Sequence, residues 1–105
     1  MRLYRIVRSN PPSLNDFESD HARGRPAPVD PAALPLWEGF SAFDTEQRAR
    51  GKAEAFPALG KWIAELEMPD VGPVQYRRTT RARGHYTVWG SSAIVCRCIV
   101  RMIVV

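Results

Sequence analysis

Most of the second half of this 105-residue chain is predicted to form β-strands, and this limits the folds that the chain can adopt. Residues 61–68 alternate between apolar and polar side chains, which is typical of a half-buried strand. Further strands are expected at 74–78, 85–89 and 93–105. The last of these is apolar on both faces, which predicts a central position in a sheet.

The first half of the chain alternates between strands and helices. Strands are expected at residues 2–8 and 37–43, and one helix follows each of them. Ser13 caps the first helix, which ends before residue 24, and Asp44 or Thr45 caps the second. Residues 24–35 contain four prolines and predict a long loop. The chain is therefore expected to form one α+β domain over residues 1–105, with a mixed or antiparallel sheet of five to six strands and two helices.

Five aromatic side chains are expected in the core because large aromatic residues are usually buried. They are Trp37, Phe40, Phe43, Phe56 and Trp62.

The charge of the chain favours anionic partners without requiring them. The formal net charge is +4, and 13 of the 15 positive residues are arginine. A guanidinium group binds phosphate or carboxylate through two parallel hydrogen bonds, so this bias fits anion recognition. Genome base composition also enriches arginine over lysine, and the bias alone therefore does not identify a ligand.

No membrane or metal partner is expected from the motifs. The N-terminus carries charges throughout and does not read as a secretory signal. The apolar run 93–105 is short and is interrupted by Arg97 and Arg101, so it does not fit a membrane span. Cys96 and Cys98 would share one face of a strand and lack further metal ligands. We expect free thiols, a cytoplasmic location and no metal site.

The segment 77–85, RRTTRARGH, is the strongest functional signal, and we call it the arginine loop. Its guanidinium groups, hydroxyl groups and glycine provide the donors and the close backbone approach that phosphate oxygens need. Aromatic residues beside it would stack a nucleotide base. Alternatively, the loop is solvated, or it pairs with Glu65 and Glu67 on a neighbouring strand. The expected ligand-binding residues are Arg77, Arg78, Arg81, Arg83, Tyr86 and Trp89.

His85 closes the arginine loop and is a possible general acid or base. A histidine side chain exchanges protons near neutral pH, which suits that role. A lone histidine at the edge of a strand is also commonly an ordinary surface residue, and this alternative stays open.

A resemblance to a known family lies in three segments: LYRIV with Arg5, GFSAFDTEQRARGKA with Ser41, and Glu65-Leu66-Glu67. In these segments the chain resembles small bacterial ADP-ribosyltransferase-like proteins, which include toxins that act on NAD. The resemblance implies that Arg5 holds NAD, that Ser41 supports the site and that Glu67 orients the ribose. Glu65 and Glu67 also read as the polar face of a regular strand.

Three functions follow from these patterns. The first is binding of a phosphate-bearing ligand, a nucleotide or a nucleic acid, at the arginine loop. The second is NAD-dependent transfer or hydrolysis, with NAD as the cofactor and a catalytic set consisting of Arg5, Ser41, Glu67 and His85. The third is a protein-interaction module of the toxin–antitoxin type, in which the loop docks on an acidic protein.

Overall fold

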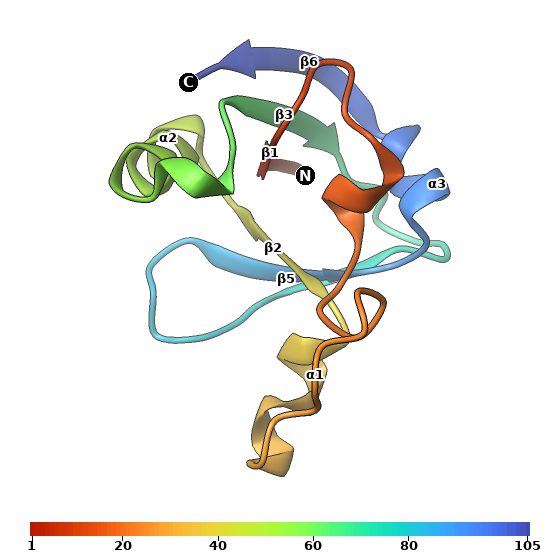
Figure 1. The fold of residues 1–105 in the computed structure, drawn as a ribbon. Coiled ribbons are helices and arrows are strands. Elements are labelled where there is room, and N and C mark those ends of the chain that lie inside the picture. The colour runs from red at the N-terminus through yellow and green to blue at the C-terminus, as the bar shows by residue number, and fades with distance from the viewer.

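The computed structural model describes residues 1–105 and contains a single six-stranded antiparallel sheet (Figure 1). The strand order is β4-β5-β2-β1-β3-β6. The strands are β1 (Arg2–Val7), β2 (Phe40–Phe43), β3 (Trp62–Glu67), β4 (Gln75–Arg78), β5 (His85–Trp89) and β6 (Ile99–Val104). The α+β class predicted from the sequence is confirmed, and the sheet is antiparallel throughout.

Only one helix, α2 (Glu46–Ala55), is longer than five residues. The other α-helices are α1 (Leu34–Trp37) and α3 (Ser92–Cys96), and the 3-10 turns are η1 (Leu14–Phe17), η2 (Pro31–Ala33) and η3 (Pro57–Leu59). Of the two predicted caps, Asp44 and Thr45, it is Thr45 that begins α2, by accepting a hydrogen bond from the Arg48 amide. None of the helices has the length and hydrophobicity needed to cross a bilayer.

The sheet consists of two parts joined by a narrow seam. β1 and β2 pair at a single position, Tyr4 opposite Phe43, whereas β1 pairs with β3 along its whole length and β2 pairs with β5 along its whole length. β4, β5 and β2 therefore form one part, and β1, β3 and β6 form the other. In Figure 1, β2 runs diagonally between the two parts. We call the junction of β1 and β2 the seam.

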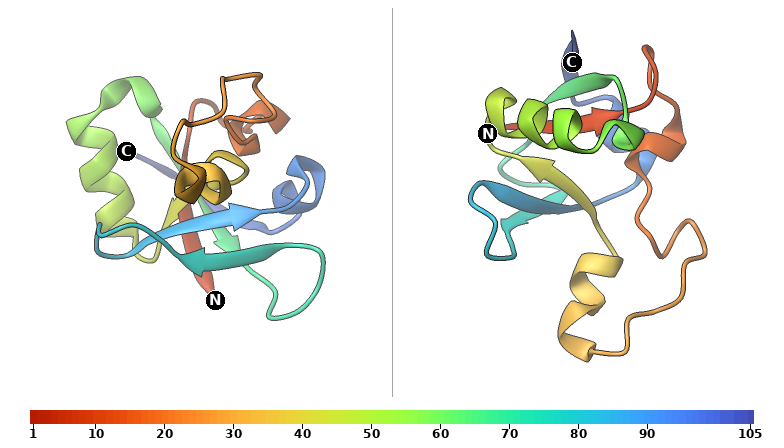
Figure 2. Two further views of the ribbon diagram at one scale, coloured as in Figure 1. Left: turned by 90° about the horizontal axis from the view of Figure 1, so that it is seen from below. Right: turned by 60° about the vertical axis from the view of Figure 1, so that its left-hand side comes forward.

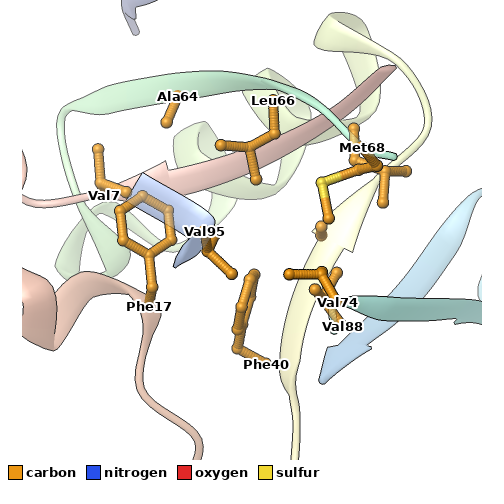
Figure 3. Close-up of a cluster of buried hydrophobic side chains, with 11 residues drawn as sticks. Val7, Phe17, Phe40, Ala64, Leu66, Met68, Val74, Val88 and Val95 are labelled. Carbon is orange, nitrogen blue, oxygen red and sulfur yellow. The ribbon is translucent and has the colours of Figure 1, made fainter. Parts of the chain in front are cut away.

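Hydrophobic residues are buried on both faces of the sheet. The larger cluster lies beneath η1 and α3 and includes Phe17, Phe40, Leu66 and Val95 (Figure 3). The smaller cluster lies beneath α2, where the Ala49 and Ala53 stripe packs against Ile6 and Ile63. Small side chains on α2 allow the helix to approach the strands closely.

The prediction of one long, central strand at residues 93–105 is wrong. Residues 92–96 form α3, and β6 lies at the edge of the sheet. Ser91 begins α3 by accepting a hydrogen bond from the Ile94 amide. A short apolar run fits a buried helix as well as a buried strand, and the preceding serine selects the helix.

Cys96 and Cys98 therefore lie at the end of α3 and just before β6 instead of on one strand. Both are free, as expected. Burial raises the pKa of both thiols, which lowers their reactivity.

Residues 13–43 also depart from the sequence prediction. The helix expected after Ser13 is only the η1 turn, residues 31–37 form η2 and α1, and β2 begins at Phe40. α1 and the segment before it project from one end of the sheet (Figure 1). Pro31 and Pro35 lie in the first turns of η2 and α1, where the missing backbone donor is tolerated. Of the five aromatics expected in the core, Phe40 is buried and Phe56 is 55% exposed.

Candidate functional site

A cavity of about 310 Å³ opens at the seam of the sheet. β1 and β2 contribute to it, together with the segment that follows β1, the α2–η3 region and the arginine loop. The polar or charged residues that line it are Arg5, Arg8, Asp16, Arg23, Ser41, Lys52 and His85. Segments far apart in the sequence meet here because β1 and β2 separate beyond their single pair.

Arg5 crosses the seam between the two parts of the sheet. Its Nε donates to the Asp16 carbonyl at 3.0 Å, and its Nη1 donates to the Ser41 carbonyl at 2.9 Å. The guanidinium group also lies over the Phe40 ring, 5.1 Å from the ring centroid. The side chain therefore supplies hydrogen bonds where the strand ladder between β1 and β2 is interrupted.

The charge of Arg5 has no carboxylate partner within ion-pair distance. Burial lowers the pKa of Arg5 to about 10, and the positive charge of Arg23 acts in the same direction. Arg5 stays charged at neutral pH, but its environment disfavours that charge. A guanidinium group has five N–H donors, so three remain beyond the two that hold backbone carbonyls.

Asp16 is the only acidic residue that lines the cavity. Its carboxylate accepts hydrogen bonds from the backbone amides of Arg8 and Ser13, both at 3.0 Å. The side chain is buried, and the second of these bonds closes the capping box of η1. Asp16 therefore holds the chain around the cavity and only partly balances the charge there.

Arg8, Arg23 and Lys52 are exposed and form no ion pair. Together with Arg5 they place four positive groups around the cavity against one carboxylate. Walls with such an excess of one sign attract ligands of the opposite charge.

Ser41 and His85 form a hydrogen-bonded pair at the edge of the cavity. The Ser41 Oγ lies 2.9 Å from the His85 Nε2, and the His85 Nδ1 lies 3.2 Å from the Thr79 carbonyl. When Nδ1 donates its proton to that carbonyl, Nε2 is left to accept the Ser41 hydroxyl proton. This arrangement fits a base that receives a proton from a hydroxyl group.

The arginine loop does not pair with the acids of β3. Glu65 bonds to Arg2 and Arg101, and Glu67 bonds to Arg2. The internal-pairing alternative for the loop is therefore wrong. The four loop arginines form no ion pair, and Ala82 and His85 are the loop residues that line the cavity.

Gly84 is a buried residue of the arginine loop and lies against Asp44 and Arg48. Its φ is +74°, a conformation that favours glycine, and its carbonyl accepts the Asp44 amide at 3.0 Å. A Cβ at this position would lie 2.3 Å from the Asp44 Oδ1 and 2.5 Å from the Arg48 Cδ. The sequence predicts a close approach of this glycine to a phosphate group, whereas in the structure it approaches the start of α2, which lies beside the β4–β5 turn (Figure 2).

The other expected ligand-binding residues are dispersed. Arg77 lies over the Trp89 ring at 5.5 Å from its centroid, and both line a separate shallow hollow. Tyr86 packs against the larger hydrophobic cluster. Arg78, Arg81 and Arg83 are exposed and line neither hollow.

Of the proposed catalytic set, the structure brings Arg5, Ser41 and His85 together and leaves Glu67 outside the cavity. Glu67 is exposed and its Oε2 accepts a hydrogen bond from the Arg2 Nε at 2.7 Å. Sequence reasoning did not identify Arg8, Asp16, Arg23 and Lys52 as lining residues. Asp16 was visible only as a helix-capping residue, and the other three carry no motif.

No family model, curated protein or solved structure matches the chain. The resemblance to ADP-ribosyltransferase-like proteins therefore stays a prediction. No group of three or more histidine, cysteine, aspartate or glutamate side chains is arranged to hold a metal ion. The fold and the site define an α+β domain with a positively charged cavity between the two parts of its sheet.

Proposed function

We propose that the protein binds a phosphate-bearing ligand, a nucleotide or a nucleic acid, in the cavity at the seam. The observation that supports this most strongly is Arg5, a half-buried guanidinium group without a carboxylate partner. A charge removed from water is costly unless an opposite charge balances it. A phosphate group in the cavity would provide that charge and would accept the remaining N–H donors of Arg5.

The exposed cations would then bind the outer oxygens of the ligand. Arg8 and Arg23 follow β1, and Lys52 approaches from α2. Arg81 and Arg83 flank Ala82 at the rim, so their charges would attract an anion before it enters. In this proposal the arginine loop steers the ligand and the cavity holds it.

The test is calorimetric titration of the protein with inorganic pyrophosphate and with ATP. An Arg23→Gln, Lys52→Gln double variant should bind at least about tenfold more weakly, since hydrogen bonds to charged groups contribute about 1.5–3 kcal/mol each. An Arg97→Gln, Lys61→Gln double variant loses the same charge at exposed positions outside the cavity and is the matched control. Equal losses in both double variants, or no binding by the unmodified protein at low salt, would overturn the proposal.

NAD-dependent transfer or hydrolysis is the second candidate function. The convergence of Arg5, Ser41 and His85 on one cavity favours it, because an anion-binding group lies beside a hydroxyl–imidazole pair. Against it, Glu67 is outside the cavity, and the carboxylate of Asp16 is held by backbone amides.

Release of nicotinamide from NAD tests this second function. The candidate predicts release above a protein-free blank that is lost in Ser41→Ala and in His85→Ala. Absence of release, or full retention of release in both variants, would eliminate it.

The interaction-module proposal rests on the same loop. Arg78, Arg81 and Arg83 are exposed and free of ion pairs, so they are available to an acidic protein surface. A triple Arg→Gln variant at these positions would lose such a partner and keep pyrophosphate binding within about threefold, because steering charges chiefly affect association rates.

A further inference from the structure

A second hollow adjoins the cavity and shares two residues with it. Ser41 and His85 line both spaces. On the far side of this pair, the second hollow is lined by Pro26, Pro28 and Trp37 from the projecting segment that contains α1. The two spaces thus lie next to each other, with the serine–histidine pair between them.

The chemistry of the two spaces differs sharply. No arginine or lysine lines the second hollow, whereas four line the cavity. Proline, alanine, leucine and tryptophan make up half of its ten lining residues, the other half is polar, and Asp20 is its only acid. One space is suited to an anion, and the other is suited to a flat, weakly polar group.

Trp37 is held in place before any ligand binds. Its ring stacks on the His21 ring with centroids 4.3 Å apart and an interplanar angle of 28°. Its Nε1 donates to the Arg25 carbonyl at 3.1 Å. A fixed aromatic side chain loses little conformational entropy when a ligand packs against it.

We infer that the two spaces hold one nucleotide, with its phosphates in the cavity and its heterocyclic base in the hollow beside Trp37. The ribose would then lie over Ser41 and His85, whose polar atoms suit its hydroxyl groups. This inference rests on the proposed function and specifies its ligand. It also moves the base-binding role from Tyr86 and Trp89, the aromatic residues beside the arginine loop, to Trp37.

The experiment compares ADP with inorganic pyrophosphate by titration calorimetry at one ionic strength. Both carry a diphosphate, and only ADP carries a base and a ribose. Stacking of a base on an aromatic side chain contributes about 1–3 kcal/mol. We therefore expect the unmodified protein to bind ADP about 5- to 100-fold more tightly than pyrophosphate.

Trp37→Leu should remove that advantage and leave pyrophosphate binding unchanged. Trp37→Tyr should keep much of the advantage because it keeps a planar ring. Trp62→Leu is the matched control, since Trp62 lies on β3, lines neither space and should leave the advantage intact. Pyrophosphate binding in each variant verifies that the cavity is still folded.

Equal affinity for ADP and pyrophosphate in the unmodified protein would overturn the inference and leave the proposed function standing. Loss of the ADP advantage in Trp62→Leu but not in Trp37→Leu would also overturn it. Equal loss of ADP and pyrophosphate binding in Trp37→Leu would show that Trp37 only supports the cavity. Binding of neither compound would overturn both the inference and the proposed function, and tighter binding of a single-stranded oligonucleotide than of ADP would identify nucleic acid as the ligand.

Discussion

Arg5 combines a structural and a ligand-binding task in one side chain. It holds the carbonyls of Asp16 and Ser41, and it leaves donors that a ligand can use. A lysine has a compact ammonium group and lacks the planar fork that reaches two separated carbonyls. The requirement for arginine at this position therefore follows from geometry as well as from charge.

Arg5→Lys should lower the free energy of unfolding by about 1–3 kcal/mol, the usual contribution of hydrogen bonds to charged groups. Pyrophosphate affinity should fall although the formal charge is preserved. Urea unfolding and calorimetry measure the two effects. Arg97→Lys, at an exposed site without an ion pair, should change neither, and unchanged binding in Arg5→Lys would argue against a role for Arg5 in the site.

Glu65 makes the stability of the fold sensitive to acid. Burial raises its pKa, but the hydrogen bond and charge of Arg101 and the charge of Arg2 outweigh burial, so the pKa lies below its usual value. A lowered pKa in the folded state adds stability above the unfolded-state pKa near 4.5, and this stability is lost as the pH falls through the lower, folded-state value.

Glu65→Gln should therefore flatten the decline in stability between neutral pH and pH 3. The exposed residue Glu67 provides the matched control, and Glu67→Gln should have the smaller effect because exposed ion pairs contribute little. Urea midpoints measured across this pH range give the comparison. Identical profiles for Glu65→Gln and the unmodified protein would show that the ion pairs of Glu65 do not stabilise the fold.

At the scale of elements, the arginine loop is positioned by α2. The Gly84 carbonyl accepts the Asp44 amide, and the Asp44–Arg48 ion pair at 2.6 Å packs against the glycine. This contact fixes the start of β5, and with it His85, relative to the cavity. The loop is consequently attached to the helix on one side and open to solvent at its arginines.

Gly84→Ala should destabilise the fold by about 2–4 kcal/mol, because an L-residue with positive φ and an overpacked Cβ each cost about 1–2 kcal/mol or more. Thermal unfolding monitored by circular dichroism measures the loss. Gly51→Ala is the matched control, since Gly51 lies within α2 with open space around its Cα, and alanine is the better helix former there. A stability change of the same sign in both variants would contradict this account of Gly84.

The elements that carry local signals were predicted well from the sequence. The alternating pattern predicted the position of β3, and the two candidate caps Asp44 and Thr45 predicted the start of α2 to within one residue. The apolar run after Ala93 led to a wrong prediction of a strand, because its periodicity does not distinguish a helix from a strand. The cavity could not be predicted, since Arg23 and Lys52 approach it only after β1 and β2 separate at the seam.

At the scale of the whole molecule, ion pairing is uneven over the surface. Glu65 and Glu67 are paired with Arg2 and Arg101 on the part of the sheet formed by β1, β3 and β6. The cations around the cavity and on the arginine loop have no such partners. Positive side chains without an ion pair therefore surround the cavity and occupy the arginine loop.

The unpaired cations around the cavity predict that pyrophosphate binding weakens as salt concentration rises, because salt screens exposed charges. The Arg23→Gln, Lys52→Gln double variant should show a shallower dependence than the Arg97→Gln, Lys61→Gln double variant. Titrations at several concentrations of sodium chloride provide the slopes. Equal slopes for the two double variants would place the binding charges elsewhere.

The narrow seam has a dynamic consequence. Because one residue pair joins the two parts of the sheet, small openings at β1 and β2 need not disrupt the pairing of β1 with β3 or of β2 with β5. Backbone amides beside the seam should exchange with deuterium faster than those of β3, which has neighbours on both sides. A bound ligand that contacts Arg5 from one part and Ser41 from the other would slow this exchange in both strands, and the protection would map the site without any substitution.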